Sequence, residues 1–124
     1  MANEISVSCG ITVSKTNGPK ASFPSETKQI DLAGTLYSSA VQVIGTGSHE
    51  ALTIVADQST AGWAYFRNID ATNYVEIGVD VGATFGPLLR LYPGQFTVTR
   101  LTTTAVYAKA NTSSVSLQYF ILQP

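Results

Sequence analysis

The sequence predicts an all-β protein, a two-sheet antiparallel β-sandwich that is jelly-roll-like. About nine or ten short segments alternate apolar and polar residues at spacings of roughly 8 to 12 residues, which is typical of sandwiches and barrels. No stretch longer than one turn has the periodicity of an amphipathic helix. Long loops between segments of uneven length favour two sheets over a closed barrel.

The chain is expected to form one sandwich domain, residues 1–124, in which residues 1–25 supply an N-terminal strand, or arm, and a loop. The first strand is expected over residues 5–13. Its apolar positions alternate with serine, threonine and glycine; they are Ile5, Val7, Cys9, Ile11 and Val13. An Asn-Gly turn and a proline end the strand, and an extended loop is expected up to Ser25. This segment either folds onto the chain's own sheet or reaches a neighbouring chain, and the sequence leaves both open.

Three shorter strands are expected next along the chain. They cover residues 27–32, with Ile30 and Leu32 facing inward, residues 37–44, carrying Val41 and Val43, and residues 51–56, with Leu52 and Ile54 facing inward. A glycine-rich turn that holds His49 separates the second from the third, and a polar loop follows the third.

Residues 61–100 form the centre of the pattern, and we expect an antiparallel meander there because the connections are too short for parallel crossovers. Its strands are expected over residues 63–69, 74–80, 87–92 and 95–100, with Val75, Ile77 and Val79 on one face of the second. Pro93 and Gly94 give the strongest turn signal. Two further strands complete the chain: one with Val106, Ala108 and Ala110 on one face, and one with Val115, Leu117, Tyr119 and Ile121.

The composition favours a subunit that packs against other proteins. Only 12% of the residues are charged, about half the usual share, and the net charge is −1. Neither nucleic acid nor an anionic membrane is therefore an expected partner. A surface of hydroxyl and amide groups carries little charge that would repel another copy of the chain. In addition, 44% of the residues are hydrophobic.

The cysteine count and the N-terminus indicate synthesis in a cytosol. Cys9 is the only cysteine, so an intrachain disulfide is excluded. Because Cys9 lies on the apolar side of an alternating strand, we expect a small buried side chain. The first residues lack the basic and apolar regions of a signal peptide, and no apolar run reaches the roughly 18 residues of a transmembrane segment.

No catalytic residue, metal site or cofactor is expected, so the chain is predicted not to be an enzyme. A hydrolytic triad needs a histidine, and His49, the only one, lies among turn residues where we expect it to be solvated. Zinc needs several histidine or cysteine ligands. Glu76 and Asp80 share a strand face, but four residues of strand separate them by about 13 Å, too far for a glycosidase pair.

One aromatic cluster has two readings. Trp63, Tyr65 and Arg67 alternate along one expected strand, so on an exposed face they form an aromatic platform that stacks a sugar ring or anchors a protein. In the other reading, Trp63 and Tyr65 belong to the core and Arg67 lies near its edge.

Half of the chain resembles small virion proteins of tailed bacteriophages. The similar segments are residues 62–70 (GWAYFRNID), 73–78 (NYVEIG), 89–95 (LRLYPGQ) and 106–111 (VYAKAN). The resemblance implies a β-rich, cofactor-free assembly protein of the virion. Within that group the size and composition are most like those of capsid decoration (cement) proteins, which have jelly-roll-like folds and are usually trimers.

The resemblance implies a homotrimer that binds the major capsid protein or another virion protein and stabilises the phage head. We expect assembly contacts at Ile5, Val7, Ile11, Val13, Asn17, Phe23 and Tyr92, because long exposed strands invite pairing with another chain. The alternative is a tail or baseplate module that recognises a cell-surface glycan through the aromatic platform. The sequence leaves head and tail locations both open.

Overall fold

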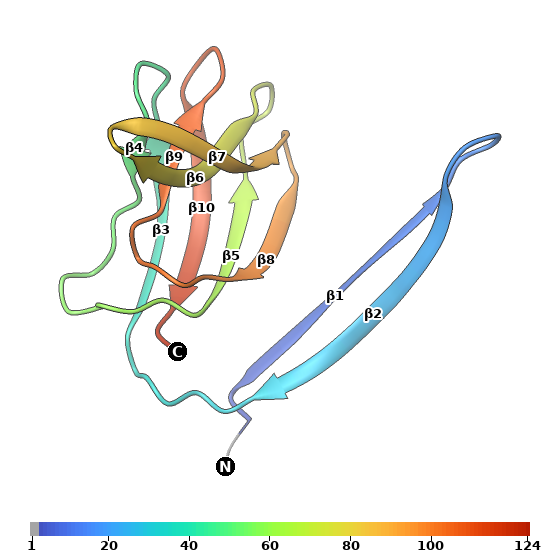
Figure 1. Ribbon diagram of the computed structural model, residues 1–124, viewed down its shortest axis with the longest axis horizontal. Coiled ribbons are helices and arrows are strands. Elements are labelled where there is room, and N and C mark those ends of the chain that lie inside the picture. The colour runs from blue at the N-terminus through green and yellow to red at the C-terminus, as the bar shows by residue number, and fades with distance from the viewer. Residues whose placement is uncertain (1–2) are drawn as a thin grey trace. The chain divides into compact units, whose positions relative to one another are not determined.

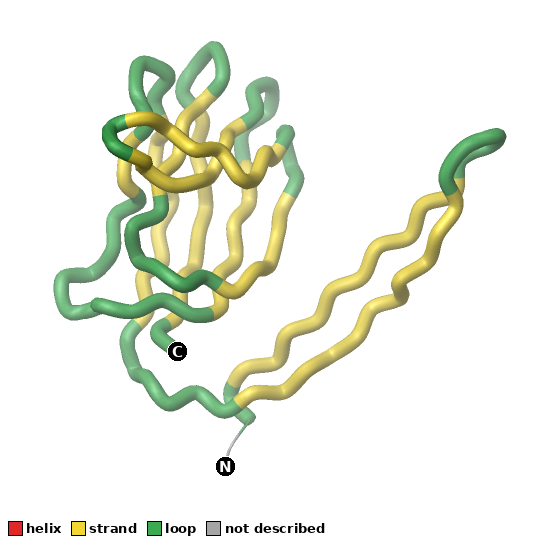
Figure 2. Tube along the Cα trace, in the orientation of Figure 1, coloured by secondary structure: helices red, strands yellow, loops and turns green. Residues whose placement is uncertain are grey.

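The computed structural model describes residues 3–124, which form ten strands and no helix (Figure 2). The chain divides into two compact units, a hairpin unit that ends at Ala33 and a sandwich unit, Gly34–Pro124. The strands are β1 (Ile5–Ser14), β2 (Lys20–Ile30), β3 (Tyr37–Ile44), β4 (Glu50–Ala51), β5 (Trp63–Asn68), β6 (Val75–Val81), β7 (Thr84–Leu91), β8 (Phe96–Arg100), β9 (Tyr107–Ala110) and β10 (Val115–Leu122).

In the hairpin unit, β1 and β2 pair only with each other, as a two-stranded antiparallel sheet. The predicted loop before Ser25 is wrong, because β2 is one continuous strand that includes Pro24. The strand predicted over residues 27–32 exists, but it begins at Lys20 and ends at Ile30. The register shifts between Cys9 and Ile11, and Pro24 is tolerated at this bulge because no ladder hydrogen bond is needed from it. A Cβ on Gly10 would lie 2.6 Å from the backbone nitrogen of Ser25, so the bulge requires glycine.

The sandwich unit confirms the predicted fold class. Its two four-stranded sheets have the orders β3-β10-β5-β8 and β4-β9-β6-β7, and every pair is antiparallel (Figure 1). Strands from the start of the unit lie beside strands from its end, β3 beside β10 and β4 beside β9, which is the arrangement of a double-sheet jelly roll.

The predicted meander over residues 61–100 is wrong. β5 and β6 follow each other directly in sequence but belong to different sheets, and so do β7 and β8. Only β6 and β7 form a hairpin. The connections are short because they cross between the two layers at the ends of strands, and short connections alone do not distinguish this course from a turn within one sheet.

The core lies between the two sheets, and the alternation of the last strands predicts it correctly. Its buried apolar residues are Ile44, Leu52, Ala61, Ala64, Phe66, Val75, Ile77, Leu91, Val106, Ala108, Ala110, Val115, Leu117, Tyr119 and Ile121. The predicted strand over residues 51–56 is only two residues long, yet Leu52 is buried and Ile54 packs against the core as expected. Burial raises the pKa of Tyr119, whose hydroxyl donates to the carbonyl oxygen of Thr53 at 2.8 Å.

Buried polar side chains join the two sheets. The amide of Asn68 in β5 donates to the carbonyl oxygen of Leu91 at 2.8 Å and to that of Asn73 at 2.9 Å. Its own oxygen accepts from the backbone N–H of Asp70 at 2.8 Å. Because Leu91 ends β7 in the other sheet, this one side chain fixes the spacing of the layers at that point.

β3 turns its polar residues inward. Ser38 is buried and its hydroxyl donates to Gln58 at 2.6 Å, and the side-chain oxygen of Gln42 accepts from the backbone N–H of Thr53 at 2.9 Å. The alternation of the strand therefore places Val41 and Val43 on its outer side, where both are exposed.

No helix among residues 3–124 has the length and apolar character that crossing a membrane requires.

Candidate functional site

The hairpin of β1 and β2, called the arm here, has one apolar face. Residues paired across an antiparallel ladder project from the same side of the sheet, and Ile11 pairs with Phe23 as Val13 pairs with Ala21. This side is the arm face; it consists of Ile5, Val7, Cys9, Ile11, Val13, Ala21, Phe23, Glu26, Lys28 and Ile30. The opposite side carries mainly hydroxyls, among them Thr12 and Ser22, whose oxygens lie 3.4 Å apart.

The arm face is exposed to solvent because the hairpin unit has no second layer of its own. Ile11 is 68% exposed and Phe23 is 65% exposed. The expectation of a buried Cys9 is wrong for this reason: its thiol lies on the apolar side of β1, as the alternation indicates, but it is exposed. The arm face has no packing partner within the hairpin unit. Because isolated two-stranded hairpins are only marginally stable in water, the arm would gain stability from a partner on this face.

Six of the seven residues expected at assembly contacts belong to the arm. Ile5, Val7, Ile11, Val13 and Phe23 share the arm face. Asn17 lies in the turn at the tip with a φ of 57°, a left-handed conformation that asparagine tolerates. Tyr92 is apart from them, in the sandwich unit just after β7.

The sheet β3-β10-β5-β8 has an apolar side that faces away from the core. Tyr65 on β5 pairs with Phe120 on β10 and with Val98 on β8. The ring of Phe120 also packs, tilted, against the ring of Tyr37 on β3, with 5.5 Å between the ring centroids. This side is the outer face; it consists of Tyr37, Ser39, Val41, Val43, Trp63, Tyr65, Arg67, Phe96, Val98, Arg100, Ser116, Gln118, Phe120 and Leu122. No second layer of the sandwich unit covers it.

The aromatic platform lies on the outer face. Trp63 and Tyr65 are half-buried among their neighbours and Arg67 is exposed, while Ala64 and Phe66 between them point into the core. Tyr65 stacks on Phe96 at 6.4 Å between ring centroids. Of the two readings of this cluster, the one with Trp63 and Tyr65 outside the core is correct.

The outer face carries only positive charge. Arg67 pairs with Phe96 across the ladder and Arg100 pairs with Trp63, and none of the face residues is acidic. Among residues 3–124 neither arginine has an ion-pair partner. A partner that offers apolar groups and carboxylates is therefore complementary to this face.

The opposite sheet, β4-β9-β6-β7, carries an ion pair on its outer side. Arg90 donates to the carboxylate of Glu76 at 2.8 Å and lies 4.3 Å above the ring of Tyr74. A hydrogen bond to Tyr92 and, after it, the hydrogen bonds to Glu76 raise the pKa of Arg90 above its usual value. Tyr92 packs edge-on against Tyr74 at 5.3 Å. This side is called the polar face.

His49 is packed, so the expectation of a solvated turn histidine is wrong. Its ring stacks on Phe85 at 5.4 Å and meets the edge of Tyr107 at 5.3 Å. Its Nε2 lies 3.1 Å from a carboxylate oxygen of Asp80, and the side chain is only 15% exposed. Asp80 and Phe85 lie in the β6–β7 hairpin, far from His49 along the chain, so the residues next to His49 in the sequence could not indicate these contacts.

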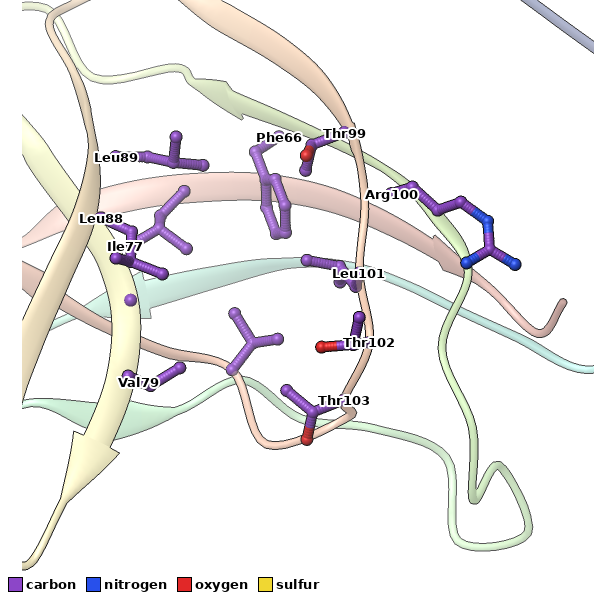
Figure 3. A pocket seen from close by; sticks show the side chains of 12 residues that line it. Phe66, Ile77, Val79, Leu88, Leu89, Thr99, Arg100, Leu101, Thr102 and Thr103 are labelled. Atoms are coloured by element: carbon purple, nitrogen blue, oxygen red, sulfur yellow. The ribbon is translucent and has the colours of Figure 1, made fainter.

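One cavity of about 240 Å³ opens between β7 and the segment that follows β8. Figure 3 shows Phe66, Ile77 and Leu101 directed into it, whereas Arg100 extends away. Its lining holds no carboxylate, histidine or cysteine, so it offers apolar contact and no acid–base chemistry.

No protein-family model matches the chain, and no curated protein or solved structure shows significant similarity to it.

Proposed function

We propose that this chain is a non-enzymatic structural protein of a tailed-bacteriophage virion, a decoration (cement) protein that binds the capsid surface and stabilises the head, acting as a homotrimer. The single observation that supports it most is the arm, which has strands of 10 and 11 residues and an uncovered apolar face. A hairpin of this length without a second layer gains its stability by packing on another chain.

The mechanism is burial of apolar and amide-rich surface at the joints between capsomers. A specific interface buries about 1,200 Å² or more, and repetition over a shell turns individually weak contacts into high avidity. The low charge of the chain supports this role, because few ionised groups must be desolvated when its surfaces are covered.

The test is co-sedimentation of the purified chain with heads and, separately, with tails of the phage that encodes it. We expect binding to expanded heads that saturates at a fixed copy number per capsomer and raises the temperature at which the heads rupture. Binding to tails alone, or no binding to either, would overturn the decoration role.

Two matched pairs of substitutions show which side of the arm matters. Ile11→Asp with Phe23→Asp places two carboxylates on the arm face, and we expect it to reduce head binding by at least about a hundredfold. Thr12→Asp with Ser22→Asp places the same charges at the adjacent ladder position on the hydroxyl side, and binding should stay within about threefold of wild type.

The second candidate function is a tail or baseplate module that binds a cell-surface glycan. The observation that favours it is the exposed outer face, where Trp63, Tyr65 and Arg67 stand together with Phe96. Aromatic rings flanked by cationic groups suit a sugar that carries carboxylates. A glycan array decides between the candidates: binding that Trp63→Ala abolishes at an unchanged melting temperature would support this module, and an empty array would remove it.

A further inference from the structure

We propose that the arm face of one copy packs on the outer face of a second copy, so that each chain both gives an arm and receives one. The inference deepens the proposed function, on which it rests for the view that the chain works by assembly. It identifies the partner of the arm as the chain itself, where the proposed function leaves the contacts within the trimer undefined.

The two faces have matching chemistry. The arm face is mainly aliphatic, with Ile11 and Val13 beside one aromatic ring, and the outer face carries several aromatic rings, among them Tyr65 and Phe96, which stack on each other. Both are sheet surfaces, and two sheets pack face to face about 10 Å apart when their inner sides are apolar. When such contacts repeat around a ring, both of the apolar surfaces that each chain leaves open are covered.

The charges also match. Glu26 lies on the arm face opposite Cys9 and has no ion-pair partner among the described residues. The outer face offers Arg67 and Arg100 and no acidic residue. Lys28, the other charge of the arm face, lies nearer the base of the hairpin, and its long side chain can keep the ammonium group in water.

The two faces are of similar size. In each contact the ten residues of one arm face meet the fourteen residues of the neighbouring copy's outer face, which makes a contact smaller than the standard interface of about 20–30 residues from each partner. Each copy takes part in two such contacts, one through its arm face and one through its outer face. A closed ring of copies is the arrangement in which every arm is received.

The test uses Cys9 as a reporter, because it is the only cysteine and lies on the arm face. A second cysteine is introduced on the outer face of the full chain, as Val41→Cys on β3 or as Val98→Cys on β8. The matched control is Leu88→Cys, which is also exposed but lies on β7 of the opposite sheet. Each protein is oxidised mildly and analysed on a denaturing gel without reductant.

We expect at least one of the two outer-face variants to form interchain cross-links between Cys9 and the new cysteine, about tenfold more than the Leu88→Cys control, because a seated arm holds the thiols at a high effective concentration. Peptide mapping identifies the pairs. Links between two Cys9 thiols only, a faster-migrating internally linked monomer, or equal linking in the control would each overturn the inference.

Native mass gives a second, independent reading. The wild-type chain should have a mass of three copies, or of another closed ring, whereas Ile11→Asp with Phe23→Asp should be a single copy with the melting temperature of its sandwich unit unchanged. A single-copy wild type at micromolar concentration would overturn the inference. Heads are absent from both experiments, so a chain that forms the cross-linked ring but binds no head refutes the capsid role and leaves the exchange intact.

Discussion

The two sheets of the sandwich share one core but present different outer sides. On the polar face, Arg90 is paired with Glu76 and packed over Tyr74. On the outer face, Arg67 and Arg100 have no acidic neighbour and stand beside exposed aromatic rings. A protein that met only water would gain nothing from this asymmetry, because an exposed apolar side without a partner is an aggregation hazard. The difference supports the proposal that the outer face packs against another protein.

The largest effect is expected where the two sheets are joined. Asn68→Ala removes a fully buried amide and, with it, the hydrogen bonds that this amide donates to the carbonyl oxygens of Leu91 and Asn73. We expect the free energy of unfolding to fall by about 2–4 kcal/mol. Urea denaturation followed by tryptophan fluorescence measures it, since Trp63 is the only tryptophan.

The matched control for this change is Gln118→Ala. Gln118 lies on β10 in register with Arg67, one strand away from Asn68, but it is exposed on the outer face. Its loss should change the free energy of unfolding by less than about 0.5 kcal/mol. Equal costs for Asn68→Ala and Gln118→Ala would contradict the view that the buried amide holds the layers together.

An intermediate effect distinguishes the two faces directly. Phe96, 64% exposed, stacks on Tyr65 on the outer face, and Tyr92, 48% exposed, packs on Tyr74 on the polar face. Truncation of either ring to alanine should cost about 1 kcal/mol or less in the single chain, because each loses one aromatic pair. Only Phe96→Ala should also weaken self-association, by about tenfold, in sedimentation measurements.

Equal effects of Phe96→Ala and Tyr92→Ala on self-association would remove the distinction between the faces. A loss of association with Tyr92→Ala alone would reverse it and would assign assembly to the polar face. Tyr92 is the residue of the sandwich unit that the sequence predicted as an assembly contact, so this pair of variants also tests that prediction.

The smallest effect concerns the turn that carries the chain from β5 in one sheet to β6 in the other. The carboxylate of Asp70 accepts hydrogen bonds from the backbone N–H groups of Asn73 and Thr72, which lower the pKa of Asp70 below its usual value. A lowered pKa in the folded state means that the charged group stabilises the fold above its unfolded pKa, and that this stabilisation is lost as the pH falls through the folded pKa.

Asp70→Asn should therefore lower the melting temperature slightly at pH 7, and the difference from wild type should shrink below about pH 4, where the wild-type carboxylate becomes protonated. Thermal unfolding of both proteins between pH 2.5 and 7 measures it. A difference that stays constant over this range would show that the charge of Asp70 does not contribute.

The sequence predicted the parts of this fold that depend on local periodicity. Alternation along residues 115–122 identified the buried side of β10. It also placed Val75, Ile77 and Val79 on one face of β6, and of these Val75 and Ile77 are buried. Any strand with one buried and one solvent-exposed face has a hydrophobic pattern that repeats every two residues, so this pattern can be recognised without knowing which strands are neighbours. The same alternation identified the apolar side of β1, and its side assignment was correct.

Periodicity does not say whether an apolar side is covered. Cys9 and Val115 lie in equally regular strands, yet one is exposed on a two-stranded sheet and the other is buried between two sheets. Likewise, the neighbours of His49 come from β6, β7 and β9, which are distant in sequence. These outcomes depend on which layers stack, and that is a property of the whole chain.

The amino-acid sequence by itself thus determined the all-β class, most strands, the apolar side of several strands such as β1 and β10, and the low proportion of charged residues. Only the tertiary structure decided that β5 and β6 belong to different sheets, that Trp63 and Tyr65 lie outside the core, and that the arm has no second layer in its own unit. The physical reason is that the alternation along a strand repeats every two residues, whereas sheet order and burial depend on contacts between segments tens of residues apart. The chain-entropy cost of such a contact changes only slowly with the number of residues between the segments, so sequence separation does not tell which strands become neighbours.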